Sequence, residues 1–161
     1  MTNLEIAKVF KDIADILEIK GENPFKVRAY RRVVTSIEEL TVPVTQLVAE
    51  DRLEEIPGAG DAIKKKIIEL VNTGHLKYYE DLKASIPAGV LDLLHVPGIG
   101  PKTAAALVKE AGITSIDALE GAMKEDRAIP HIGEKTREKI LQRIQEMKWV
   151  GGRRVDYRHS A

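Results

Sequence analysis

Two short stretches of the chain carry glycines at a spacing that suits the binding of a phosphate group, Gly58-Ala59-Gly60 and Gly98-Ile99-Gly100. Glycine adopts backbone conformations that are closed to other residues, and it lets the main chain approach a ligand closely. A helical pattern follows each stretch, so the free N–H groups and the positive dipole end of a helix face the turn. Both stretches therefore predict a site at which backbone amides bind an anion.

The same frame of an apolar residue, proline, a variable residue, an apolar residue and glycine occurs a third time, at Ile129-Pro130-His131-Ile132-Gly133. We call residues 56–60, 96–100 and 129–133 the first, second and third hairpins. Such repetition is typical of a recurring structural unit. The frame resembles the helix-hairpin-helix motif, whose usual ligand is the sugar-phosphate backbone of a nucleic acid, contacted without reading bases. The alternative is a glycine-rich turn within a helical bundle that binds no ligand.

The three hairpins are not equivalent in sequence. The second is nearest to the ideal motif, because the small residue Ala104 lets its helix pack closely on the turn. In the first, the Asp61 carboxylate can cap the same N–H groups that a phosphate would bind. The third has His131 in place of the first glycine, so we expect it to pair structurally with the second hairpin. The resemblance also implies a Na⁺ or K⁺ ion on the hairpin carbonyls near Gly58 and Gly98, and no other cofactor.

Charge and composition restrict the function classes. The 161 residues include 25 Lys plus Arg and 25 Asp plus Glu, a net charge of zero, so a nucleic acid would have to be bound by local basic patches. The absence of cysteine excludes disulfides and thiolate metal sites, and the four histidines are too far apart to predict a metal site. The few aromatic residues argue against base stacking. We find no signal peptide and no apolar run of membrane length, so we expect a cytoplasmic, nucleoid-associated protein without membrane contact.

Helical periodicity with short breaks predicts an all-α fold, an array of short helices with two or three helix-hairpin-helix motifs. Asn3 and the Asn23-Pro24 pair are predicted to start helices, and Gly74 and Gly112 are predicted to end them. No alternating apolar pattern is long enough to predict a strand. The predicted helices cover, approximately and in order, residues 3–20, 24–40, 44–50, 61–73, 75–85, 90–95, 101–111, 115–124 and 134–147.

The break at Pro87-Ala88-Gly89 is the predicted boundary between two domains. We expect residues 1–86 to form one domain with the first hairpin. Residues 87–148 are expected to form a second domain with the second and third hairpins. Residues 149–161 lack helical periodicity and are predicted to form a mobile tail.

The helix predicted after Asn23 has a basic outer side. Arg28 and Arg32 stand one turn apart on that side, Arg31 lies at the edge of the apolar face, and Lys26 lies in the first turn. These side chains either contact phosphates or form a solvated helix face. Tyr30 lies within the apolar face, which favours a place in the core.

Three segments together resemble the N-terminal portion of bacterial and archaeal family X DNA polymerases, relatives of DNA polymerase beta. They are residues 21–32 (GENPFKVRAYRR), 56–74 and 96–102, and the order and spacing match from about Asn3 to Gln145. The resemblance implies a small lyase-type domain that holds the 5′ end of a gap, followed by a domain that grips the primer duplex.

Polymerases of this family continue into a palm domain whose aspartates bind magnesium. This chain contains no Asp-x-Asp pair, so we expect no nucleotide transfer, and the chain is either a stand-alone relative or a fragment of a longer protein.

The resemblance also implies a candidate enzyme, a 5′-deoxyribose-phosphate lyase. In the family a lysine amine forms a Schiff base with an abasic sugar, and β-elimination follows. The matching residue is Lys66, and Lys26 and Tyr30 match residues that line the same pocket and touch the 5′ phosphate. Positions that are basic in relatives hold Glu54, Asp61 and Ala62 in this chain, which depletes the phosphate pocket.

Helix geometry gives independent support for Lys66. The stripe formed by Ile63, Ile67, Leu70 and Val71 predicts the buried face, and Lys66 falls roughly 85° from its centre. Partial burial and the charges of the preceding lysines both favour the neutral, nucleophilic amine. The alternative is a lysine that extends along the edge of the core with its amine in water.

Three functions remain open at this point. The first is a sequence-independent DNA-binding module for gapped, nicked or 5′-phosphorylated duplex in DNA repair by base excision. The second is the lyase, and the third is a scaffold that binds repair proteins. The predicted DNA contacts are Lys26, Arg28, Tyr30, Arg31, Arg32, Gly58, Ala59, Gly60, Lys64, Lys65, Gly98, Ile99, Gly100, Lys102 and Thr103.

Overall fold

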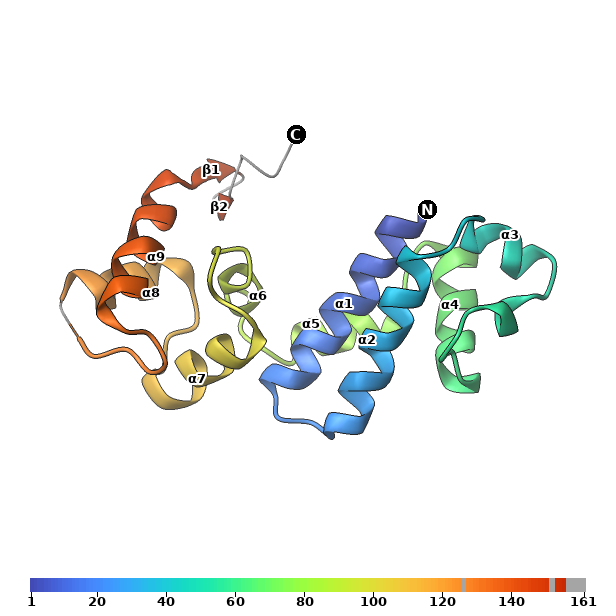
Figure 1. The fold of residues 1–161 in the computed structure, drawn as a ribbon, viewed down its shortest axis with the longest axis horizontal. Helices are drawn as coiled ribbons and strands as arrows, with labels where there is room; N and C mark the ends of the chain where they lie inside the picture. Colours follow the sequence, from blue (N-terminus) through green and yellow to red (C-terminus); the bar gives the residue numbers. More distant parts are fainter. Residues whose placement is uncertain (126, 151–152, 156–161) are drawn as a thin grey trace. The chain divides into compact units, whose positions relative to one another are not determined.

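The computed structural model describes residues 1–125, 127–150 and 153–155. Within these residues the regular structure is helical apart from one short pair of strands, which confirms the all-α prediction (Figure 1). The chain divides between Ser85 and Ile86 into two compact units. We call Met1–Ser85 unit 1 and Ile86–Ala161 unit 2. In the described residues no helix is long and apolar enough to cross a membrane.

Unit 1 is built around the helices α1 and α2. α1 packs along α2 and also contacts α5, and α3 contacts α4 (Figure 1). The core between α1 and α2 is apolar, and Phe10, Ile13 and Ile37 are fully inaccessible to solvent. The elements of unit 1 are α1 (Asn3–Ile19), α2 (Pro24–Glu38), α3 (Val44–Ala49), the 3-10 helix η1 (Leu53–Glu55), α4 (Asp61–Thr73) and α5 (Lys77–Ala84).

The start of α1 differs from the prediction that Asn3 is its cap. Thr2 is the N-cap, because its hydroxyl accepts from the Glu5 amide at 3.1 Å and the Glu5 carboxylate accepts from the Thr2 amide at 3.0 Å. Asn3 lies inside the helix, where its side chain donates to the Val42 carbonyl at 3.0 Å and accepts from the Val44 amide at 2.8 Å. The Asn3 side chain, which the sequence suggests as a cap, therefore makes a tertiary contact with the start of α3 instead.

The other predicted caps are confirmed. The Asn23 side chain accepts from the Phe25 amide at 2.9 Å, with Pro24 at the first helical position of α2. Gly74 and Gly112 end α4 and α7 in the left-handed conformation. These cap signals depend on a few consecutive residues, so the sequence alone predicts them without the tertiary packing.

Unit 2 is a second helical core. α8 packs on α9 and α6 contacts α7, and Leu93, Leu107, Leu119 and Ile144 are fully buried between them. Its elements are α6 (Val90–Leu93), α7 (Pro101–Ala111), α8 (Ile116–Lys124), α9 (Glu134–Glu146), β1 (Lys148–Val150) and β2 (Arg153–Val155).

The two strands contradict the prediction that the chain contains no strand, whereas the predicted mobile tail stays a prediction. β1 and β2 pair antiparallel, with Lys148 opposite Val155. Each strand has only three residues, which is too short for an alternating pattern to emerge, although a Gly-Gly pair between two such runs is a known hairpin signal. Residues 151–152 and 156–161, which complete the predicted tail, lie outside the described residues.

Candidate nucleic-acid interface

The three hairpins share one backbone geometry. The third position of each has a positive φ, which is +86° at Gly58, +98° at Gly98 and +62° at His131. In each hairpin the amide of the fourth position donates to the carbonyl of the first, at 3.2, 3.0 and 3.3 Å in chain order. Glycine adopts a positive φ without strain, and histidine is among the residues that tolerate it. The repeated frame in the sequence is therefore a repeated turn.

The glycine that closes each hairpin is the N-cap of the next helix. Gly60, Gly100 and Gly133 precede α4, α7 and α9, and no side chain caps any of these helices. The carbonyl of each glycine accepts the first intrahelical hydrogen bond, at 2.9, 2.9 and 2.8 Å. The amides of the first helical turn are left without a capping side chain, and the positive end of the helix dipole lies beside the hairpin. This arrangement suits an anion.

Charges in the first helical turn distinguish the hairpins. Asp61 is exposed and does not cap α4, although the sequence suggests that role. Its carboxylate nevertheless places a negative charge in the first turn of the helix. Glu134 occupies the first turn of α9. α7 begins with Pro101 and has no acidic residue in its first turn, where Lys102 is exposed and Thr103 is half-buried. The second hairpin is therefore the most favourable of the three for an anion.

α2 supports the first hairpin directly. The Ser36 hydroxyl donates to the Pro57 carbonyl at 2.7 Å. The Arg32 side chain lies against Gly58, where a methyl group on the glycine would come within 2.8 Å of Arg32 Cδ. Arg32 and the first hairpin, which the sequence predicts as separate DNA contacts, thus lie next to each other. The part played by Ser36 had no signal in the sequence.

The second hairpin lies against α9, the helix that follows the third hairpin. The third hairpin in turn lies against α7, the helix that follows the second. A methyl group at Gly98 would lie 3.7 Å from Ile140 Cγ1 on α9. In return, His131 Nε2 lies 3.4 Å from a carboxylate oxygen of Glu110 on α7. Ile99 of the second hairpin is buried among these helices. Unit 2 thereby combines the two hairpins in one packed structure.

The candidate nucleophile Lys66 lies beside an aromatic ring that had no signal in the sequence. Lys66 Nζ on α4 is 4.7 Å from the ring centroid of Tyr78 on α5, and Lys26 Nζ on α2 is 5.4 Å from the same centroid. Lys66 and Tyr78 are half-buried, whereas Lys26 is exposed. Two of the residues predicted for the lyase pocket, Lys66 and Lys26, therefore converge on one ring.

Aromatic stacking connects this pocket to the core of unit 1. Tyr30 stacks on Tyr78 with a centroid separation of 6.2 Å, and Phe10 stacks on Tyr30 at 6.1 Å. Burial, and then the neighbouring phenol of Tyr78, raise the pKa of Tyr30 well above its ordinary value. Tyr30 is 3% exposed, so it belongs to the core, and its ring supports the pocket from behind Tyr78.

The arginines of α2 have different environments. The Arg31 guanidinium donates to Asp15 at 3.0 Å and to Glu18 at 2.9 Å, which commits it to α1. The Arg28 guanidinium lies 4.6 Å from the ring centroid of the exposed Phe25. Arg28 and Arg32 are exposed. These two are therefore better available to a phosphate than Arg31.

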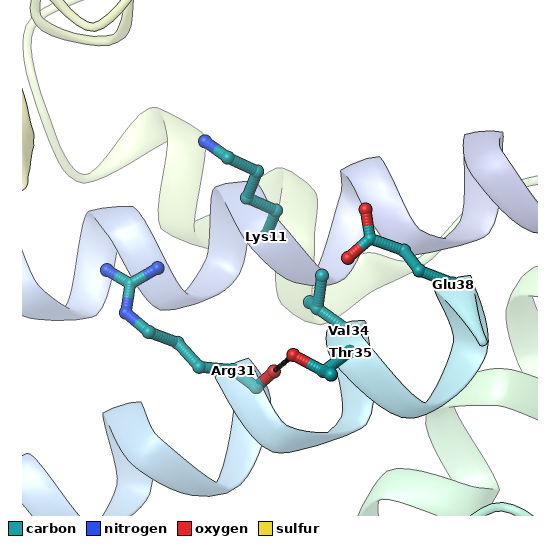
Figure 2. Close-up of a pocket in the computed structure, with 5 residues that line it drawn as sticks. All are labelled: Lys11, Arg31, Val34, Thr35 and Glu38. Carbon is teal, nitrogen blue, oxygen red and sulfur yellow. Dashed lines mark hydrogen bonds between the residues drawn. The ribbon is translucent and has the colours of Figure 1, made fainter.

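A shallow pocket lies elsewhere on the α1–α2 pair, lined by Lys11, Arg31, Val34, Thr35 and Glu38. Figure 2 shows the Lys11 and Arg31 side chains extending from the two helices at one end and Glu38 at the other. Both cations form ion pairs with the buried carboxylate of Asp15, at 2.9 and 3.0 Å. The two cations that line the pocket are thus already engaged in a structural ion-pair network. In the described part of the chain no group of His, Asp and Glu side chains is arranged to hold a metal ion.

Comparison with protein families assigns both units to one kind of structure. Residues 1–76 match the model of a helix-hairpin-helix domain, and residues 90–146 match that of a SAM-like helix-hairpin-helix tandem. The chain is built of helix-hairpin-helix domains. The tandem match begins at the first residue of α6 and ends at the last residue of α9, so the third hairpin, although it contains His131, is part of the motif.

In comparison with curated proteins, these helix-hairpin-helix domains match the N-terminal part of family X polymerases. The chain is 31% identical over 148 residues to the DNA polymerase/3'-5' exonuclease PolX of Bacillus subtilis (strain 168), which is 91% of this chain and 25% of that protein. It is 29% identical over 125 residues to DNA polymerase lambda of Arabidopsis thaliana (77% and 22%) and 25% identical over 120 residues to that of Rattus norvegicus (74% and 20%). The chain spans a quarter or less of the length of these relatives.

Proposed function

We propose that this chain binds the sugar-phosphate backbone of duplex DNA without reading its sequence, that it prefers gapped or nicked duplex, and that it serves in DNA repair. The observation that carries the proposal is the repeated turn, in which a positive-φ residue precedes a helix whose first amides have no capping side chain. The relatives are DNA polymerases by name, which supplies the class of ligand. We assign no nucleotide transfer to these residues.

The second hairpin is the expected main contact, with Lys102 beside it. Replacing Lys102 with alanine should reduce the slope of log K against log salt concentration by about 0.9, the value for one phosphate contact. Lys109 is an exposed lysine in the last turn of the same helix, so Lys109→Ala is the matched control and should leave the slope unchanged. Equal slopes for the two variants and the unmodified chain would remove Lys102 from the interface.

Preference for a gap is tested separately from binding itself. Affinity for a duplex with a one-nucleotide gap and a 5′ phosphate is compared with affinity for the intact duplex of the same sequence at one salt concentration. Tighter binding to the gapped duplex supports the proposal. Equal affinities would leave a general duplex-binding module, and no binding at low salt would favour a protein scaffold instead.

A second function, 5′-deoxyribose-phosphate lyase, is favoured by the convergence of Lys66 and Lys26 on the Tyr78 ring. One amine is then available to attack the sugar, and the other to hold the 5′ phosphate. Borohydride reduces a Schiff base to a stable amine, so a DNA with an incised abasic site should become covalently attached to the chain. Lys66→Ala should abolish the adduct, whereas Lys8→Ala, which changes an exposed lysine of α1 outside the predicted DNA contacts, should not. An adduct that survives Lys66→Ala would assign the chemistry to another amine.

A further inference from the structure

Tyr78 is the residue that the two candidate amines share. The ammonium groups of Lys66 and Lys26 come from α4 and α2, yet both lie over its ring, at 4.7 and 5.4 Å from the centroid. The residue falls outside the match to the first helix-hairpin-helix domain, which ends at residue 76. Because the ring contacts both amines, it can stabilise a positive charge on either of them during the proposed reaction.

The plane of this ring is fixed by its neighbours. Tyr30 stacks on it with an angle of 15° between the rings, and Phe10 continues the stack with an angle of 18°. Phe10 is fully buried and Tyr30 nearly so, whereas Tyr78 is half-buried. The stack thus runs from the core to a ring that is partly accessible, and the Tyr78 hydroxyl also interacts with that of Tyr30.

The proposed lyase reaction places a positive charge next to this ring. The neutral Lys66 amine adds to the C1′ aldehyde carbon of the ring-opened sugar, and the adduct loses water to give an iminium cation. Water removes a C2′ proton, and the electron pair neutralises the iminium to give an enamine. The enamine then expels the C3′ oxygen, which forms a C2′=C3′ double bond, regenerates the iminium and releases the downstream strand with its 5′ phosphate. Hydrolysis of the carbon–nitrogen bond then restores the amine. The nitrogen is cationic in the intermediate from which the proton is lost.

We infer that Tyr78 is a positioning residue for this reaction, whose aromatic face stabilises the iminium at Lys66 and keeps the Lys26 ammonium in the same pocket. An aromatic face attracts a cation that lies within about 6 Å of the ring centroid, because the face carries the negative part of the ring quadrupole. The ring, and not its hydroxyl, is the active feature. The inference rests on the proposed lyase function.

The test measures the rate of borohydride-trapped adduct formation with saturating protein on a duplex that contains an incised abasic site. Tyr78→Leu should slow trapping by about five- to tenfold, the range expected for one cation–π contact, and Tyr78→Phe should trap at nearly the unmodified rate. Tyr79→Leu is the matched control, because the adjacent ring contacts Lys83 and not the pocket amines. This control should trap at the unmodified rate.

Replacement of Tyr78 by pentafluorophenylalanine separates the charge effect from packing, since it keeps the ring and reverses its quadrupole. This variant should be as slow as Tyr78→Leu, and it provides the test if Tyr78→Leu does not fold. Equal rates for the fluorinated and Phe variants would overturn the inference while leaving the lyase intact, as would a Phe variant as slow as Tyr78→Leu. Absence of any Lys66-dependent adduct in the unmodified chain would overturn the lyase proposal and the inference with it.

Discussion

Replacement of Gly58 by alanine tests how the first hairpin and α2 work together. Gly58 has a φ of +86°, and holding an alanine there costs about 1–2 kcal/mol. The added methyl group would also lie 2.8 Å from Arg32 Cδ and 3.0 Å from Arg32 Nε. Because the arginine side chain is flexible, it should move away from the hairpin and relieve the clash. The free energy of unfolding should therefore fall by about the backbone cost alone.

Gly98→Ala supplies the control for stability. Its φ is +98°, but the methyl group would meet Ile140 at an ordinary contact distance of 3.7 Å. Both variants should lose a similar amount of stability, which corresponds to a decrease of about 5–10 °C in the melting temperature of a small domain. Circular dichroism during heating measures this decrease. An unchanged melting temperature for both variants would contradict the strained turn geometry.

The displacement of Arg32 is detected in DNA binding by a double-mutant cycle with Arg32→Gln. If Gly58→Ala acts by removing Arg32 from the hairpin, the two changes remove the same contact, and the double variant should bind gapped duplex about as well as Arg32→Gln alone. The affinities are measured by fluorescence anisotropy at one salt concentration. Strictly additive losses in binding free energy would refute the argument that Arg32 and the first hairpin form one contact.

Three further predictions concern stability. The Arg137 guanidinium donates to three carbonyls at and beyond the end of α8, and the shortest of these hydrogen bonds is 2.6 Å. Arg137→Ala should therefore lower the free energy of unfolding, measured by urea denaturation, by about 1–3 kcal/mol. An unchanged urea midpoint would contradict this prediction. Gly89→Ala would place a methyl group 2.5 Å from a backbone oxygen and should cost about 1–3 kcal/mol, whereas Gly121→Ala, in open space within α8, should not destabilise. Burial, and then a hydrogen bond to an α1 carboxylate, raise the pKa of Tyr79, so the stability that this phenol contributes is complete below about pH 10 and is lost as the pH rises further. Tyr79→Phe should flatten that alkaline decline, and an equally steep decline would assign it to other groups.

The sequence alone was sufficient for the features that depend on a few consecutive residues. The glycine frame predicted the turns, and the cap signals at Asn23, Gly74 and Gly112 are confirmed. Its resemblance to the N-terminal part of family X polymerases is confirmed as well. Asn3 was misassigned because a partner 39 residues away in the chain competes with the local cap. Strands β1 and β2 were missed because their pattern is too short to read.

Only the tertiary structure decided which side chains share a site. Arg31 and Arg32 are neighbours in the sequence, yet one pairs with carboxylates of α1 and the other lies on the first hairpin. Lys26, Lys66 and Tyr78 belong to three different helices and meet because α2, α4 and α5 pack in one unit. Backbone turns depend on the conformations that adjacent residues can adopt, and the identities of those residues are given directly by the sequence. The position of a side chain relative to a distant helix is governed by how the cores pack, and no single segment contains that information.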